Sequence, residues 1–137
     1  MNETLERPRP AAAEMDWTPT QEEFDRFAAL SGDNNPIHVD PDFSARTRFG
    51  RTVSHGMLLY TKLYGLIRRT WPGAGHLSQT LMFPHPAYAG ETVTITVTPA
   101  EEDATLLAIE VRRKADGTPV LTAECRLSDE AITEAAR

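Results

Sequence analysis

Two side chains in a short polar segment, Asp33 and His38, are of the types that carry out acid–base catalysis. They lie five positions apart across Pro36, a spacing that fits no helix face but that a turn can close. A carboxylate and an imidazole that face each other can share a water molecule, with one group accepting a proton while the other donates. The alternative is structural, with the aspartate in an Asx turn and the histidine bonded to a backbone carbonyl. Spacing alone favours the structural interpretation.

A second candidate is Gly56, which follows His55 where a long apolar helix is predicted to begin. Unpaired N–H groups and the positive end of the helix dipole can polarise a carbonyl oxygen at such a position. The missing side chain would let an acyl group approach the backbone, so the Gly56 N–H could act as an oxyanion donor. A glycine kept for helix packing is the alternative, and it stays open. His55 is either a second acid–base group or a packing residue, and packing is favoured.

Other catalytic motifs are absent from the sequence. There is no phosphate-binding glycine loop, no Gly-x-Ser-x-Gly elbow, and only one cysteine, Cys125. The four histidines, at positions 38, 55, 76 and 85, do not show the i, i+4 spacing of a helical metal site. We therefore expect neither a metal nor a cofactor.

Helices must position these residues in the first half of the chain. Capping and apolar periodicity predict a helix from about residue 20 to 31, a loop over 33–39, and a short helix from 41 to about 49. The next helix, 54–70, carries apolar residues around most of its circumference, which is typical of a buried helix.

Strands dominate the second half. Apolar and polar residues alternate over 92–98, 107–111 and 121–127, and 77–83 is a further candidate. Asp116-Gly117 predicts a tight turn that makes the last two strands an antiparallel hairpin. Helices followed by antiparallel strands indicate an α+β domain in which the sheet packs on one apolar helix.

The chain is long enough for one domain, at 137 residues. We expect a flexible or edge-lying N-terminal arm over 1–15, a single domain over 16–128, and a polar C-terminal tail over 129–137. No apolar run approaches the roughly 20 residues that span a bilayer, so no membrane association is expected. The single cysteine and the absence of a signal-peptide pattern favour a cytoplasmic protein.

The net charge of −6 makes nucleic acid an improbable partner, because phosphate backbones are repelled by an acidic surface. A polyanionic molecule such as coenzyme A needs only a local basic cluster. Arg46, Arg48 and Arg51 form one candidate, and Arg68 and Arg69 form another. A solvated face is the favoured interpretation of both clusters.

Two segments together resemble a known family. Residues 27–43, which include Ser-Gly-Asp-Asn-Asn-Pro-Ile-His, and residues 53–59, Val-Ser-His-Gly-Met-Leu-Leu, are similar to the MaoC-like (R)-specific enoyl-CoA hydratases and 3-hydroxyacyl-thioester dehydratases. A later segment, 86–93, looks like the family's proline and Gly-acidic turn, so the resemblance covers roughly 20–127. It implies a hot-dog fold, in which an antiparallel sheet wraps around a central helix, here 54–70.

The resemblance also implies an activity and partners. The implied activity is the reversible hydration of a trans-2-enoyl thioester of CoA or acyl-carrier protein, without cofactor or metal. The implied assembly is a homodimer or a higher homo-oligomer. By position, Asp33 activates the water, His38 shares it, and the Gly56 N–H receives the thioester carbonyl. Asn35 helps to hold the loop. The other substrate-binding candidates are Ser54, His55, Met57, Tyr60 and Tyr64.

Tyr64 departs from the family pattern, because some members carry a small hydroxyl residue there. If Tyr64 or Tyr60 points into the acyl tunnel, it should shorten the accepted chain; otherwise both are core residues. The unusual segment 83–86 is a further candidate for altered tunnel lining.

Two other functions fit a hot-dog fold. One is thioester hydrolysis, which the Asp-x-x-Pro-x-His arrangement of residues 33–38 disfavours. The other is a non-catalytic acyl-binding protein or the partner subunit of a heterodimeric dehydratase. The non-catalytic function would be preferred if Asp33 or His38 were missing, and both are present.

Overall fold

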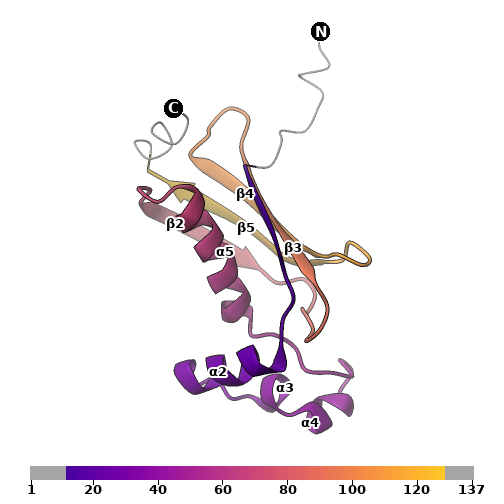
Figure 1. The fold of residues 1–137 in the computed structure, drawn as a ribbon. Helices are drawn as coiled ribbons and strands as arrows, with labels where there is room; N and C mark the ends of the chain where they lie inside the picture. Colours follow the sequence, from indigo (N-terminus) through magenta and orange to yellow (C-terminus); the bar gives the residue numbers. More distant parts are fainter. Residues whose placement is uncertain (1–11, 129–137) are drawn as a thin grey trace.

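The computed structural model describes residues 12–128 (Figure 1). The expected C-terminal tail and most of the expected N-terminal arm lie outside the described residues. Residues 13–15, which were assigned to the arm, are instead the start of a strand at the sheet edge. Its alternate side chains Ala13, Met15 and Trp17 pack on the core, a pattern too short to stand out after the preceding alanines.

Five antiparallel strands form one sheet in the order β1-β3-β4-β5-β2. The strands are β1 (Ala13–Trp17), β2 (His76–Met82), β3 (Val93–Pro99), β4 (Leu106–Arg113) and β5 (Pro119–Leu127). The predicted hairpin of the last two strands is confirmed by the antiparallel pairing of β4 with β5. Gly117 in its turn has a φ of 76°, which glycine adopts without steric cost.

The helices of the first half are α2 (Gln21–Ser31), α3 (Pro36–Val39) and α4 (Pro41–Ala45). The first prediction is confirmed, since Thr20 and Glu23 form a capping box and Gly32 ends the helix. The predicted loop contains the single turn α3, because Asn35 accepts from the Ile37 N–H and Pro36 suits the first helical position. α4 ends at Ala45 and is shorter than predicted.

The central helix, α5 (Gly56–Thr70), lies against one face of the sheet (Figure 1). Its residues Leu63 and Ile67 are fully buried in one core cluster with residues of β3, β4 and β5. Burying each such side chain stabilises the fold by about 1.5–3 kcal/mol. Burial is confined to this side, however, because Met57 and Tyr64 are 52% and 40% exposed. The prediction of a buried helix is therefore confirmed for the side that faces the sheet and wrong for Met57 and Tyr64.

A curved antiparallel sheet packed on one long helix is the hot-dog arrangement. Helices α2, α3 and α4 lie together near the N-terminal end of α5, so the polar loop and the start of α5 meet there (Figure 1). Within residues 12–128, no helix has the length and apolar character needed to cross a bilayer.

Candidate active site

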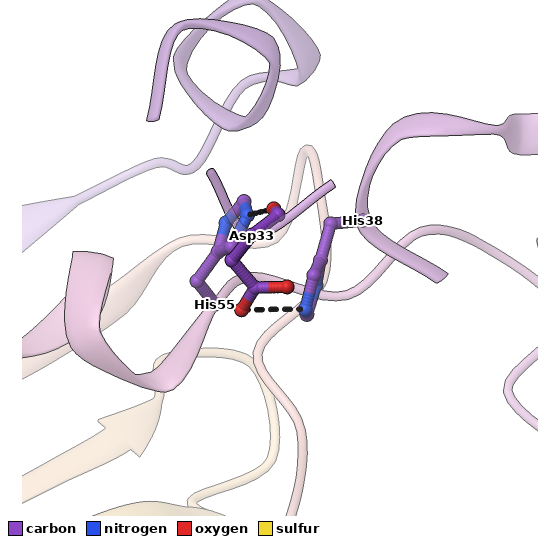
Figure 2. A group of neighbouring side chains, drawn as sticks. All are labelled: Asp33, His38 and His55. Atoms are coloured by element: carbon purple, nitrogen blue, oxygen red, sulfur yellow. Dashed lines mark hydrogen bonds and ion pairs between the residues drawn. The ribbon is translucent and has the colours of Figure 1, made fainter. Parts of the chain in front are cut away.

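The turn between α2 and α3 brings Asp33 and His38 together (Figure 2). His38 Nε2 lies 3.8 Å from Asp33 Oδ2, which is too long for a direct hydrogen bond. At that separation a water oxygen can lie within hydrogen-bond distance of both atoms. The Asp33 side chain is 55% exposed, whereas that of His38 is 10% exposed. The pair therefore combines a solvent-facing carboxylate with a fixed, buried imidazole.

The orientation of His38 defines which of its nitrogens faces Asp33. His38 Nδ1 lies 2.8 Å from the backbone oxygen of Val53. A carbonyl oxygen only accepts, so Nδ1 carries the proton and donates, and neutral His38 presents the lone pair of Nε2 toward Asp33. Ionised Asp33 and neutral His38 are then two acceptors that face one gap. A water held there can donate one O–H to each of them.

His55 lies behind this pair and holds it in place. His55 Nε2 donates to the backbone oxygen of Asp33 at 2.9 Å, and its ring stacks on that of His38 with centroids 3.9 Å apart. The rings of Phe27 and His55 also meet in an edge-type contact, with their centroids 4.8 Å apart. His55 itself is only 1% exposed. This placement agrees with the packing role that the sequence favoured.

The environment of His55 also keeps its ring neutral. Burial lowers its pKa below the ordinary value, and nearby His38 lowers it further. The bond to Asp33 opposes this shift. Among the described residues, none bonds to His55 Nδ1.

Asp33, His38 and His55 bring three potential metal-ligand atoms within 4.8 Å of one another. Two of their ring nitrogens, however, already donate to carbonyl oxygens. The stacked rings also lie in nearly parallel planes, so an ion in the plane of one ring is outside the plane of the other. The geometry suits a shared water or proton better than a metal.

Gly56 is the first residue of α5, so its N–H has no carbonyl of a preceding helical turn to bond. His55 at the N-cap provides no side-chain hydrogen bond to the helix. Gly56 also borders a cavity of about 260 Å³. The cavity is lined by Ser54, His55, Gly56, Leu59, Phe83, His85, Pro86, Ala87 and Val120. A free donor therefore borders a largely apolar cavity, as an oxyanion site requires.

The remaining candidates divide into two groups. Asn35 caps α3 through the Ile37 N–H, and Ser54 lines the cavity while its hydroxyl donates to the His55 oxygen at 2.9 Å. Met57, Tyr60 and Tyr64 are not among the residues lining this cavity. Tyr60 is partly buried against the core. Tyr64 is 40% exposed, and its ring centroid lies 4.9 Å from that of His76. Of these candidates, only Ser54 lines the cavity beside Gly56, and Asn35 contributes by capping α3.

Two contributors were not identified from the sequence. One is the Val53 carbonyl, which orients His38, and a backbone oxygen leaves no signal in the residue types. The other is the apolar wall supplied by Leu59, Ala87 and Val120. Only the unusual segment 83–86 pointed to a lining from the strand region.

Comparisons with known proteins agree with this arrangement. A family model described as "MaoC like domain" matches residues 2–117. An (R)-specific enoyl-CoA hydratase of Aeromonas caviae is 43% identical over 90 residues, covering 63% of this chain and 67% of that protein. A 3-hydroxybutyryl-CoA dehydratase of Methylorubrum extorquens is 40% identical over 114 residues, covering 79% of this chain and 64% of that protein. Both named activities are hydro-lyase reactions, and this chain spans about two thirds of each relative.

Solved structures show the same fold. The unliganded R-hydratase PhaJ1 of Pseudomonas aeruginosa superposes with a TM-score of 0.77 at 30% identity, covering 84% of this chain and 77% of that one. The (R)-hydratase of A. caviae gives a TM-score of 0.75 at 33% identity, covering 90% of this chain and 97% of that one. With its hot-dog fold and a family match over most of its length, the chain belongs to the MaoC-like domain family.

Proposed function

We propose that this chain is a hydro-lyase that interconverts trans-2-enoyl thioesters and (R)-3-hydroxyacyl thioesters. The observation that carries the proposal is the pair of acceptors, Asp33 and His38, which both contact His55, the residue that precedes Gly56 at the start of α5. The named activities of the relatives support the same reaction class.

Hydration begins with a water that donates to Asp33 and to His38 Nε2. Asp33 takes a proton from this water, and the oxygen forms a bond to C3 of the enoyl group. The electrons of the C2–C3 double bond move toward the thioester carbonyl and form an enolate. A proton from the Asp33/His38 pair then reaches C2 and completes the addition. Dehydration follows the same steps in reverse.

The proposed role of the Gly56 N–H is to stabilise the enolate by a hydrogen bond to the thioester oxygen. Negative charge on the thioester oxygen grows during the attack, so a donor there stabilises the transition state more than the ground state. Removing one such donor typically lowers kcat by about 10²–10³-fold. The apolar walls of the cavity strengthen the effect, because they exclude water from the developing charge.

The substrate we propose is an acyl-CoA or acyl-carrier-protein thioester. Its acyl part would occupy the cavity beside Gly56, whose lining includes Leu59 and Val120. The catalytic pair would reach C3 from the side of the polar loop, where Asp33 is exposed.

We also propose a homodimer formed through β2. This strand is at one edge of the sheet and exposes Leu77 and Met82, at 63% and 66%. An edge strand presents unpaired backbone groups that a second copy can bond. Light scattering on the purified protein should give twice the mass of one chain, and Leu77→Lys should lower it. Leu30→Lys is the matched control, because Leu30 is 85% exposed on α2. A monomer at all concentrations would contradict the assembly.

The activity is tested by mixing purified protein with trans-2-enoyl-CoA substrates of several chain lengths and following the loss of conjugated absorbance. Asp33→Asn and His38→Ala should each abolish most of the rate, while Asp42→Asn, at an exposed position of α4, should retain it. Water addition that survives both site substitutions would overturn the catalytic assignment. Release of free thiol would instead favour a thioesterase. Inactivity on every CoA and carrier-protein substrate would favour a binding role.

A further inference from the structure

Phe83, which directly follows β2, lies against Gly56. A Cβ atom added to Gly56 would lie 3.0 Å from Cζ of the Phe83 ring, 3.1 Å from Cε1 and 3.2 Å from Cε2. The ring therefore fills the space that any side chain at position 56 would need. Gly56 has no positive φ, so this close approach, and not backbone conformation, is what requires a glycine.

The hydrophobic core does not explain this position. Phe83 is 42% exposed and is not part of the buried core cluster. Its ring instead lines the cavity beside Gly56, together with Leu59 and Val120. Because the ring lies at the cavity and outside the core of the chain, its position bears on what the cavity admits.

The backbone around Phe83 is restrained, which fixes where the ring begins. Met82 pairs with Thr122 in the sheet, and Pro84 restricts the backbone of Phe83 to extended conformations. On the other side, the Pro86 oxygen accepts from Arg113 at 2.7 Å. Both ends of the segment are therefore anchored to the sheet.

We propose that Phe83 is a specificity-determining residue that admits thioesters without a substituent on C2 and rejects those with a methyl group there. The inference rests on the proposed function. A carbonyl oxygen bonded to the Gly56 N–H lies about 2.9 Å from its nitrogen. C2 is two bonds from that oxygen, and we place it in the cavity that Gly56 and Phe83 both line. A hydrogen on C2 fits beside the ring, whereas a methyl group contacts it.

The test compares hydration of trans-2-butenoyl-CoA with that of trans-2-methyl-2-butenoyl-CoA. The measured quantity is the kcat/KM for the 2-methyl substrate divided by the kcat/KM for the unbranched substrate. Phe83→Ala should raise this ratio by about 10-fold or more, since a methyl group in a tight pocket is worth about 10–200-fold. Phe83→Leu should give a smaller rise, and Phe83→Trp a fall. Met82→Ala is the matched control, because Met82 is the adjacent exposed apolar residue and does not line this cavity.

The outcomes separate the two proposals. If the wild-type protein hydrates the straight substrate and the ratio stays unchanged in Phe83→Ala, the role of Phe83 is overturned while the proposed function stands. If Met82→Ala raises the ratio equally, the effect belongs to the whole segment and the inference also fails. If the wild-type protein hydrates no trans-2-enoyl thioester of any chain length, on CoA or carrier protein, the proposed function falls and the inference with it. If a thermal melt shows that Phe83→Ala is unfolded, the ratios measured for Phe83→Leu and Phe83→Trp decide whether Phe83 controls specificity.

Discussion

The polar loop over residues 33–38 and the start of α5 differ in nearly every physical property, yet each fixes the other. The loop exposes the carboxylate of Asp33 to water, whereas the start of α5 borders an apolar cavity. Two histidine–carbonyl bonds cross between them in opposite directions. His38 of the loop donates to the Val53 oxygen, and His55 next to α5 donates to the Asp33 oxygen.

This reciprocal arrangement shows how one site can combine two environments. Proton transfer needs a water held by polar groups, and enolate stabilisation needs a donor in a place where water is excluded. The stacked rings of His38 and His55 form the boundary between the two regions. Substitutions on either side of that boundary should therefore have distinct signatures.

The largest effects are expected in the loop. Asp33→Asn and His38→Ala should each lower kcat by about 10²–10⁴-fold, which is the usual contribution of acid–base catalysis. Since we propose that both residues act on one water, the double variant should be little worse than either single variant. Steady-state hydration rates of the three proteins measure this. Losses that multiply would show that the two side chains act independently.

The next effect isolates the donor at the start of α5. Gly56→Pro removes the N–H but suits the first helical position, while Gly56→Ala keeps the N–H and adds a similar Cβ. Both Cβ atoms meet the Phe83 ring, so the alanine variant controls for crowding. The proline variant should have a kcat about 10²–10³-fold below that of the alanine variant. Equal rates would mean that this N–H does not bind the thioester.

A smaller effect concerns the pH dependence of stability at the boundary between the regions. Burial lowers the pKa of His55 in the folded state, so the unfolded chain binds more protons as pH falls through its ordinary value of 6.5. The stabilisation is present above that value and is lost on acidification. The titratable groups next to His55 are Asp33 and His38. Carboxylates elsewhere with lowered pKa values, such as Asp103 with a pKa of about 2, titrate well below pH 6.5 and do not contribute to this loss.

Thermal melts at pH 7.5 and pH 5.5 measure this loss. The drop in Tm should be smaller in His55→Gln than in the wild-type protein. His76→Gln is the matched control, because burial lowers the pKa of His76 as well, away from the site. It should reduce the drop in Tm without changing the pH dependence of hydration. An unchanged drop in His55→Gln would contradict a neutral, buried His55.

The smallest effect is expected at Asn35, whose side chain caps α3 through the Ile37 N–H at 3.1 Å. Asn35→Ala should cost about 1 kcal/mol of stability, the usual value for a lost cap. Asn35→Asp preserves the acceptor and should restore both stability and rate. Urea denaturation and hydration rates of the two variants check this. A rate that falls in the aspartate variant while stability recovers would point to direct substrate contact.

The sequence predicted the two regions unequally. Periodicity and turn chemistry were sufficient for the central helix, the β4–β5 hairpin and the capping box of Thr20, because these are local features. Residue types and positions made Asp33, His38 and Gly56 candidates, and the resemblance assigned their roles. Segment 83–86 was a candidate for the tunnel lining, but the close approach of Phe83 to Gly56 and the bond from His38 to Val53 depend on contacts between distant segments, which residue types do not encode. The exposed side of α5 was missed for a related reason, since apolar residues around a helix do not reveal which of them lie at an interface.

The most direct test of the central claim is chiral analysis of the product formed from trans-2-butenoyl-CoA. The wild-type protein should yield (R)-3-hydroxybutyryl-CoA, because Asp33 and His38 hold the water on one side of a thioester fixed by Gly56. The double variant Asp33→Asn/His38→Ala should yield none above the uncatalysed rate. Formation of the (S) product, or of the (R) product by the double variant, would contradict the account.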